Sequence, residues 1–489
     1  MSNPLLLLVA IVCPLLGALF SLLFPEQADK LRNRTAVGTT LVTAAAVVVL
    51  FVRVLAGDMP AVRLTELMPG VEIALSLDAL GAIFAALAAV LWVFSTLYST
   101  GYMAHGHNRR RYFCFYILSL GATMGIACAA NMVTLYLFYE FLTLFTYPLV
   151  IHEGGSEAQE AGKRYIKYSF VGAGLILLAI VMTLGASGSL AFATGGILVV
   201  TPETVRYLQV VFLCFLFGFG VKAAIMPLHA WLPAAMAAPT PVSALLHAVA
   251  VVKSGVFGIL RVMFMVFGPA ALQELGVAHV ALVLAGITII AASLLALRQD
   301  VLKKRLAYST ISQLSYIVLG AGLLTASGLT GSVLHLINHA LIKITLFFCA
   351  GAIITVTGKK RISELNGVGR RMPLTMLAFA LGSVGMIGIM PLNGFIAKMY
   401  LLKGGMEADL PAVIVILVTS AVLNAAYFLP IVVAAFFREG SFEKPQGHEA
   451  PLAMLLPVIL LAAVCLVLGI KPDTTVALAR LVAGQVFGI

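Results

Sequence analysis

The sequence predicts an all-α polytopic membrane protein with about fourteen transmembrane helices. The 489-residue chain is 61% hydrophobic and only 10% charged, with a mean hydropathy of +1.07, which is outside the range of soluble domains. Apolar stretches long enough to cross a bilayer, about 20 residues each, follow one another along the chain. The polar connections between them are short, so we expect one integral membrane domain over residues 1–489.

The first apolar stretch, Pro4–Phe24, has no basic segment before it and no clear cleavage site, so we interpret it as a retained span. The fourteen expected spans are residues 4–24, 35–56, 74–98, 112–129, 131–151, 166–187, 206–227, 241–268, 278–297, 305–325, 329–357, 372–403, 410–437 and 451–470. We group them into N-terminal helices (1–111), two five-helix repeats (112–268 and 278–437), and a last helix with a short tail (451–489).

Basic residues are distributed unevenly between the two sides of the expected membrane. Twenty of the 31 Lys and Arg fall in alternate loops on one side, at positions 30, 32, 34, 109–111, 163, 164, 167, 298, 303–305, 359–361, 370, 371, 438 and 444. Seven fall on the other side, at positions 53, 63, 206, 261, 403, 471 and 480. Because cytoplasmic loops are enriched in Lys and Arg, we expect the first set in the cytoplasm and both termini outside the plasma (inner) membrane.

The net charge of +11 is therefore explained by these loops, and we expect no nucleic-acid partner. The six cysteines lie singly and no phosphate-binding G-x-x-x-x-G-K-[ST] loop is present in the sequence. No cysteine cluster suits an iron–sulfur centre. We expect no cofactor, no metal and no catalytic centre of the chain's own.

Two apolar helices are interrupted by proline within the same motif. Residues 224–232 read AIMPLHAWL and residues 388–396 read GIMPLNGFI, so Pro227 and Pro391 stand 164 residues apart. Proline breaks a helix, and a broken helix at membrane depth is tolerated only against protein or a wet cavity. Because the second copy is offset from the first by five helices, an odd number, we predict two inverted repeats with broken helices seven and twelve, as in transport sites. Chance similarity of two kinked helices is the alternative.

Five ionisable residues lie in the middle of expected spans: Glu140, Lys222, Lys253, Lys343 and Lys398. A lysine at mid-bilayer costs roughly 2.5–3.5 kcal/mol on insertion scales, so these side chains should face protein or water. A contact between Glu140 and Lys222 would make the protonation of Lys222 depend on whether the pair is closed. The alternative is a static ion pair that joins two helices.

His335, His339 and Lys343 follow one another at i, i+4 and i+8, which places them in one stripe on an apolar helix. Imidazoles and an amine in file suit proton hopping, and hydrogen-bonded core histidines are the alternative. The spacing H-x-x-x-H also suits zinc, but no third ligand is evident and the next stripe member is a cation, so we expect no metal.

Lys253 and His247 lie on the helix after the first break, six residues apart and hence on different faces. Of the two, Lys253 is the stronger candidate for proton transfer. His229 follows Pro227 and is expected to cap the break or line its mouth.

Two polar stretches have two interpretations each. LAYSTISQLSY (306–316) could order water, or it could form interhelical hydrogen bonds. The acidic loop HEGGSEAQEAGKR (152–164) is most simply solvated, and docking of a cytoplasmic partner is the alternative.

Together these features resemble the antiporter-like subunits shared by complex I, Mrp cation/proton antiporters and membrane-bound hydrogenases. The motifs are the Glu140 helix and residues 218–248, 300–316, 335–343 and 391–398, and the resemblance covers essentially the whole chain. It implies a mid-membrane chain of proton carriers. Glu140 and Lys222 match the charged pair of the family's first half-channel, and Lys253 matches its bridging lysine. The central relay of the family is matched by His335, His339 and Lys343. Lys398 matches the ionisable residue of the second broken helix.

The resemblance implies a proton-translocating subunit driven by a peripheral NADH dehydrogenase-like or hydrogenase-like redox module, with homologous membrane subunits as partners. Lys398, where some members have Glu, resembles the Mrp D type and the complex I L or N types. The length and ending of the chain are most similar to the Mrp D type or its hydrogenase-type counterparts. The D-type member of an Mrp Na⁺/H⁺ antiporter is therefore an alternative, in which Na⁺ would also move. A stand-alone solute transporter is a second alternative, although it calls for one pocket rather than a row of charges. A structural anchor would leave the buried charges unexplained.

Overall fold

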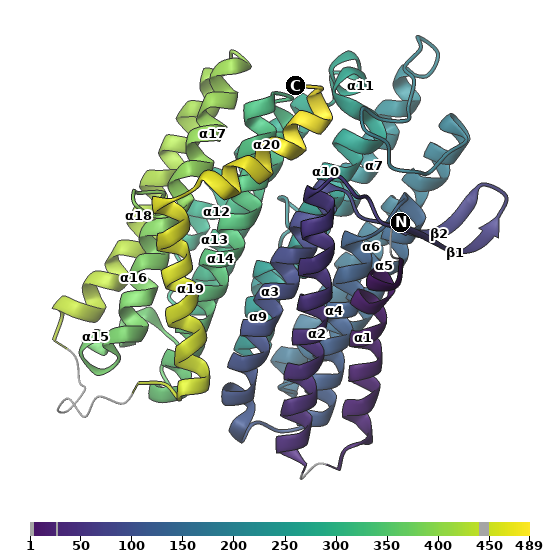
Figure 1. Cartoon of the computed structure of the whole chain (residues 1–489). Coiled ribbons are helices and arrows are strands. Elements are labelled where there is room, and N and C mark those ends of the chain that lie inside the picture. Colours follow the sequence, from purple (N-terminus) through teal and green to yellow (C-terminus); the bar gives the residue numbers. More distant parts are fainter. Residues whose placement is uncertain (1–3, 26–27, 440–448) are drawn as a thin grey trace.

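The structure is a computed structural model that describes residues 4–25, 28–439 and 449–489. These residues form a bundle of long helices with one small hairpin at its side (Figure 1). Lys444, one of the basic residues expected on the cytoplasmic side, lies outside the described residues.

The first part of the chain packs as a group of long helices, at the right of Figure 1. Its elements are α1 (Pro4–Leu23), α2 (Asp29–Leu55), α3 (Ala79–Tyr102), η1 (Met103–His105), α4 (Arg109–Ala127), α5 (Met132–Val150), α6 (Gly155–Ser187) and α7 (Val205–Lys222). Polar residues start two of these helices, as expected for N-caps. The side chain of Asp78 accepts from the backbone N–H of Gly81, and that of Asn131 from Thr134.

A β-hairpin precedes α3 and corrects the purely helical prediction. Strand β1 (Ala61–Met68) pairs antiparallel with β2 (Val71–Ser76) around a turn in which Gly70 has φ +79°. In β2 the apolar residues Val71, Ile73 and Leu75 alternate with Glu72, which is a strand period. The span expected to begin at residue 74 therefore begins only after Asp78.

The helix expected over 241–268 is not continuous. It consists of α9 (Thr240–Ala248), α10 (Val251–Arg261), the π-helical η3 (Val262–Phe267) and α11 (Gly268–Leu275). His247 and Lys253 lie on opposite sides of the interruption, so the prediction that they share one helix is wrong. The backbone leaves the helical pattern at Ala250, whose N–H donates to Leu245 five residues earlier, and neither proline nor glycine marks the place.

The second part of the chain forms the other group of helices. Its elements are α12 (Ala278–Leu297), α13 (Leu302–Gly322), α14 (Ala326–Thr357), η4 (Ile362–Glu364), α15 (Val368–Arg371), α16 (Pro373–Ile387), α17 (Gly394–Glu407), α18 (Pro411–Phe437), α19 (Leu452–Ile470) and α20 (Asp473–Phe487). The short tail expected after residue 470 is thus a helix. It crosses one end of the bundle and contacts α3, α11 and α14 (Figure 1).

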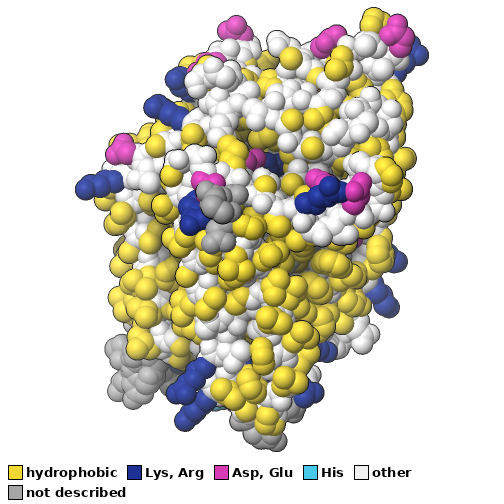
Figure 2. All heavy atoms as spheres, turned by 45° about the vertical axis from the view of Figure 1, so that its right-hand side comes forward, with side chains coloured by type: hydrophobic (Ala, Val, Ile, Leu, Met, Phe, Trp, Pro, Cys, Tyr) yellow, Lys and Arg dark blue, Asp and Glu magenta, His cyan; other side chains and the backbone are white. Residues whose placement is uncertain are grey.

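In the described part of the chain, eleven helical segments are long and apolar enough to cross a membrane. The other three expected spans correspond to α4, α13 and the interrupted pair α16–α17. Both α4 and α13 begin with clustered cations, which lowers their hydropathy. Figure 2 shows hydrophobic side chains over much of the visible face, with most charged side chains nearer its two ends.

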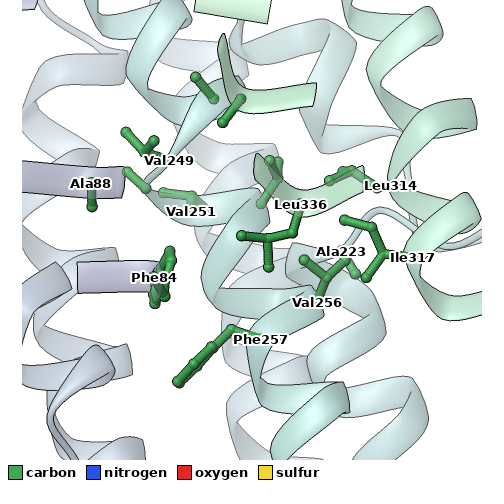
Figure 3. Close-up of a cluster of buried hydrophobic side chains, with 14 of the residues drawn as sticks. Phe84, Ala88, Ala223, Val249, Val251, Val256, Phe257, Leu314, Ile317 and Leu336 are labelled. Atoms are coloured by element: carbon green, nitrogen blue, oxygen red, sulfur yellow. The ribbon is translucent and has the colours of Figure 1, made fainter. Parts of the chain in front are cut away.

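Helix α14 is the centre of the bundle. Every residue from Ser327 to Ile353 is buried, and the helix contacts α3, α9, α13, α16, α17, α19 and α20. A helix that is mostly apolar all round is expected to be enclosed in this way. Figure 3 shows Leu336 of α14 in a cluster with Phe84 of α3 and with Val256 and Phe257 of α10. The rings of Phe84 and Phe257 stack at 4.7 Å, so apolar packing encloses the polar row described below.

A histidine pair joins two loops at the end of the bundle where α4 and α6 begin. Each ring Nε2 of His107 and His152 lies 3.1 Å from the other residue's backbone carbonyl oxygen, and the rings stack at 4.9 Å. The Arg111 guanidinium donates to the carbonyl oxygen of His152 at 3.2 Å. Burial, with the nearby charges of Arg111 and His107, lowers the pKa of His152 to about 4.

Candidate functional site

Two helices are interrupted at the predicted prolines. The first, α7, ends at Lys222, and the chain turns through Pro227 into α8 (Trp231–Ala234) and η2 (Ala235–Ala237). The second, α16, ends at Ile387, and α17 resumes at Gly394 after Pro391. The breaks expose backbone groups that side chains satisfy. For example, Trp231 Nε1 donates to the carbonyl oxygen of Val221 at 2.7 Å.

Lys222 lies at the first break with a side chain only 1% exposed. Its Nζ donates to the carbonyl oxygen of Tyr139 at 2.5 Å and lies 3.3 Å above the centroid of the Tyr139 ring. Glu140 is within electrostatic range, but its Oε1 has no hydrogen-bond partner among the described residues. The predicted partners are therefore neighbours, and the structure holds the pair open.

Lys253 of α10 lies close to the same break, where α7 ends. Two residues further along, Gly255 touches the backbone of Lys222 and Ala223: a Cβ at Gly255 would lie 2.3 Å from the Ala223 nitrogen. This close approach requires glycine at position 255. It places the first turn of α10, which carries Lys253, against the end of α7. Lys253 itself is fully buried, and its Nζ has no hydrogen-bond partner in the described part of the chain.

Opposite Lys253 stands the stripe of α14. The charge of Lys253 acts on His335, His339 and Lys343, so the three predicted stripe residues face it. The two imidazole rings are 5.9 Å apart, and Tyr316 stacks on His335 at 5.1 Å. The ring nitrogens of His339 have no hydrogen-bond partner among the described residues, whereas His335 lies beside the Gln313 backbone.

The polar stretch 306–316 forms interhelical hydrogen bonds, one of its two predicted uses, and the ordering of water stays a prediction. Lys343 Nζ donates to the carbonyl oxygen of Leu306 at 3.0 Å and to the hydroxyl of Ser309. The side-chain amide of Gln313 is buried beside the Tyr316 side chain. Ser312 donates to the carbonyl oxygen of Ile289 at 3.0 Å, which is an interhelical bond.

Lys398 lies at the second break and is 6% exposed. Its Nζ donates to the carbonyl oxygens of Met386 and Ile387, at 2.9 and 2.7 Å, where α16 ends. A Cβ at Gly388 would lie 2.6 Å from the Lys398 Cδ, so glycine makes room for the lysine stem. Lys398 acts electrostatically on His335, which joins the second break to the stripe.

Two further predicted histidines lie beside this row. His247 is fully buried against the Phe347 ring, 4.6 Å away, and its ring nitrogens have no partner among the described residues. Lys343 acts on it electrostatically, so it adjoins the row. His229 lies in the first break, 6.3 Å from the Tyr308 ring, and is half-buried.

The structure thus brings the predicted ionisable residues of α5, α7, α10, α14 and α17 into one row of neighbours. Sequence reasoning missed the carbonyl of Tyr139, the ring of Tyr316, and Asn424, whose Nδ2 donates to the Met386 carbonyl oxygen at 3.3 Å. No motif marks them, because each reaches its neighbour through the fold. Buried polar groups that lack protein partners need water, so such a row is suited to hold a hydrated file.

This architecture defines a polytopic membrane protein of the ion-transport kind. Residues 129–424 match the family model of the NADH:quinone oxidoreductase/Mrp antiporter transmembrane region, and residues 69–113 match the N-terminus of chain 5 of complex I NADH-ubiquinone oxidoreductase. The chain belongs to this NADH:quinone oxidoreductase/Mrp antiporter family and is an antiporter-like membrane subunit.

Its relatives include NADH-quinone oxidoreductase subunit N of Desulforudis audaxviator, 33% identical over 73% of this chain and 74% of the relative. NADH-quinone oxidoreductase subunit L of Mycobacterium tuberculosis is 33% identical over 80% of this chain and 62% of the relative. The Na⁺/H⁺ antiporter subunit A1 of Staphylococcus haemolyticus is 29% identical over 82% of this chain and 53% of the relative. The chain therefore spans less than two thirds of the last two.

Two solved structures have the same fold over nearly the full length. A chain of an archaeal membrane-bound sulfane sulfur reductase superposes with a TM-score of 0.89 at 25% identity, covering 99% of this chain and 98% of that one. A chain of the Mrp complex of Dietzia sp. DQ12-45-1b superposes with a TM-score of 0.87 at 21% identity, with the same coverage. The relatives belong to several kinds of complex, so the resemblance to the Mrp D type stays a prediction.

Proposed function

We propose that the chain is a proton-translocating subunit of a multisubunit membrane complex, in which protons move laterally between the two broken helices. The route starts at Glu140 and Lys222, passes Lys253 and the stripe on α14, and ends at Lys398. The observation that carries this proposal is the set of buried ionisable side chains between the two breaks: Lys222, Lys253, the three stripe residues and Lys398.

The contacts of the lysines support a transfer role over a structural one. Lys222 donates to a backbone carbonyl of the neighbouring helix α5, and Lys398 donates to carbonyls where α16 ends. Lys253 has no partner among the described residues. An unpaired buried polar group costs about 1–3 kcal/mol, so the amine of Lys253 is not explained by packing. Such groups inside a membrane are functional by default.

The finer topology belongs to the same proposal. We infer fourteen membrane-spanning helices, two inverted five-helix repeats, broken helices seven and twelve, and both termini on the extracytoplasmic side. The proline breaks at Pro227 and Pro391 and the distribution of basic loops support these assignments.

The two leading versions of the proposed function differ in their source of energy. In the first, a peripheral NADH dehydrogenase-like or hydrogenase-like module drives translocation, and the likeness to a respiratory reductase chain at 25% identity supports it. In the second, the chain is the D-type member of an Mrp antiporter, and a counter-flowing Na⁺ supplies the energy. The similarity to a Na⁺/H⁺ antiporter subunit over 82% of this chain supports this version.

The test uses inverted membrane vesicles that contain the assembled complex, with proton uptake followed by a pH-sensitive dye. Lys222→Ala and Lys398→Ala are expected to abolish uptake while the complex stays assembled. The matched control is Lys403→Ala on the same helix as Lys398, because Lys403 is exposed and forms a 3.7 Å ion pair with the exposed Glu407. Wild-type uptake in both site variants would show that this route is wrong.

The same vesicles identify the driving reaction. They are energised in turn with NADH, with hydrogen and with a Na⁺ pulse in the absence of any reductant. Proton movement with a reductant alone favours the redox-driven version, and proton movement with Na⁺ alone favours the antiporter. Uptake of an organic solute by the isolated chain would instead support a stand-alone transporter.

A further inference from the structure

Arg261 forms a buried ion pair at the end of the bundle where the β-hairpin leads into α3. It is the last residue of α10, and its side chain is only 2% exposed. Its two terminal guanidinium nitrogens donate to the two carboxylate oxygens of Asp78, the residue that caps α3, and one of these bonds measures 2.8 Å. The guanidinium carbon also lies 4.9 Å from the centroid of the Phe257 ring and 5.2 Å from that of the Phe192 ring. These contacts hold the positive charge in one place, because a bidentate pair fixes the orientation of the guanidinium.

Two spaces meet at this guanidinium. The outer one is a cavity of about 280 Å³ whose wall includes the polar side chains of Ser76, Thr194 and Gln485. The inner one has a volume of only about 10 Å³, and of the described residues that line it Arg261 alone has a polar side chain. Arg261 and Phe192 line both spaces. A polar cavity of the outer size holds water, whereas the inner space has room for one water molecule at most and offers it a single polar partner.

The inner space ends beside the first broken helix. Phe219, which lines this space, lies three residues before Lys222 on α7, and its ring is 5.2 Å from the ring of Tyr139. Tyr139 holds the ammonium of Lys222 through its carbonyl oxygen and its ring. The outer cavity, Arg261, the inner space and the Lys222 site therefore follow one another from the end of the bundle toward its centre.

An arginine at this place blocks protons and does not relay them. A guanidinium keeps its proton throughout the physiological pH range, whereas a buried lysine can release it. A fixed positive charge at a narrow point repels protons and other cations, as arginine does in water-selective channels. The dry space behind Arg261 also interrupts the chain of water molecules along which a proton would hop.

We propose that Arg261, held by Asp78, seals the first broken helix against the extracytoplasmic side, so that protons leave the central row only at the second break. The inference rests on the proposed function, which starts the route at Lys222 and assigns this end of the bundle to the extracytoplasmic side. Proton pumping needs such a seal, because a proton that reached Lys222 directly from the side of higher concentration would run backward through the row. The seal gives a function to one of the seven basic residues that the sequence assigns to that side.

The first test measures the passive proton leak of inverted vesicles that contain the assembled complex. No reductant and no Na⁺ are supplied, valinomycin and K⁺ clamp the membrane potential, and the lumen, which is the extracytoplasmic side, is loaded with acidic buffer. Arg261→Gln should collapse the pH gradient about tenfold faster than the wild type, because it removes a unit charge from a poorly solvated path. Arg206→Gln removes an exposed cation from α7 at the same end and should leave the leak unchanged. Equal leak rates in the two variants would overturn the proposal.

Asp78→Asn separates the seal from a purely structural role of the ion pair. Both Asp78→Asn and Arg261→Gln break the pair, but only Arg261→Gln removes the guanidinium. Asparagine can still cap α3, so the complex is expected to assemble. The leak of Asp78→Asn should therefore stay at the wild-type level. A leak as fast as that of Arg261→Gln would show that loosened packing opens the path, and the proposal would be wrong.

The leak and the energised uptake distinguish this inference from the proposed function. If Arg261→Gln holds the gradient as well as the wild type while Lys222→Ala and Lys398→Ala lose proton uptake, only this inference fails. If the two lysine variants take up protons at the wild-type rate, the proposed function itself has failed, whatever the leak of Arg261→Gln.

Discussion

Replacing Lys253 with methionine should make the protein more stable and stop proton transfer. Lys253 is fully buried, and its Nζ has no hydrogen-bond partner among the described residues. Methionine is unbranched and of similar length, so it fits the space of the lysine stem. The substitution therefore removes a group that the fold does not need.

The magnitude follows from the environment of the amine. A buried polar group without a partner costs about 1–3 kcal/mol in proteins, and a lysine at mid-bilayer roughly 2.5–3.5 kcal/mol on insertion scales. Lys253 also acts on Lys343 with a charge of the same sign, which adds repulsion when both are protonated. Lys253→Met should thus raise the free energy of unfolding by about 1–3 kcal/mol. Lys343→Met should gain less, because Lys343 has two partners, Leu306 and Ser309.

The assay pairs thermal denaturation of the purified complex with proton uptake by vesicles. Among the wild type, Lys253→Met and Lys343→Met, we expect Lys253→Met to have the highest melting temperature. We also expect it to show no proton uptake above background. A lower melting temperature than the wild type would refute the reasoning, because it would show that Lys253 holds the bundle together. Proton uptake at the wild-type rate in Lys253→Met would refute the place of Lys253 in the route.

Two further predictions concern packing and pH. Gly255→Ala should cost about 1–3 kcal/mol of stability and slow uptake, because its Cβ would lie 2.3 Å from the Ala223 nitrogen beside Lys222. Gly174→Ala, which has nothing within 4 Å, should melt no lower than the wild type, and equal melting of the two variants would contradict the close contact. Stability should also fall as the pH is lowered from about 6.5 toward 4, because the unfolded chain binds a proton that His152, with its pKa lowered to about 4, does not take up in the fold. His152→Asn should flatten the dependence of the melting temperature on pH over this range. An unchanged slope would assign the pH dependence to other groups.

Much of the architecture is predictable because the signals are local. The length of each apolar stretch predicted the helices, and the repeated I-M-P-L motif predicted both interruptions, at Pro227 and Pro391. The hairpin before α3 was missed, because eight residues of β1 and six of β2 are too short to stand out among long apolar runs. The break between His247 and Lys253 was missed for another reason: Val249 and Ala250 are ordinary helix residues, and tertiary packing decides their backbone.

The candidate site, like the fold, could be predicted only in part. The ionisable residues could be named from the sequence because each is a charge in an apolar stretch. Their partners could not, since the carbonyl oxygens of Tyr139, Met386 and Ile387 become available only where helices end or pack.

The central claim is that the two broken helices are connected through the stripe on α14, and Lys343→Met tests it most directly. Lys343 touches neither break: its Nζ donates to Leu306 and Ser309 of α13. Proton uptake should be lost in energised inverted vesicles while the complex keeps its subunits and melts no lower than the wild type. Uptake at the wild-type rate in a complex that retains Lys222 and Lys398 would mean that each half works alone, and it would contradict the lateral route.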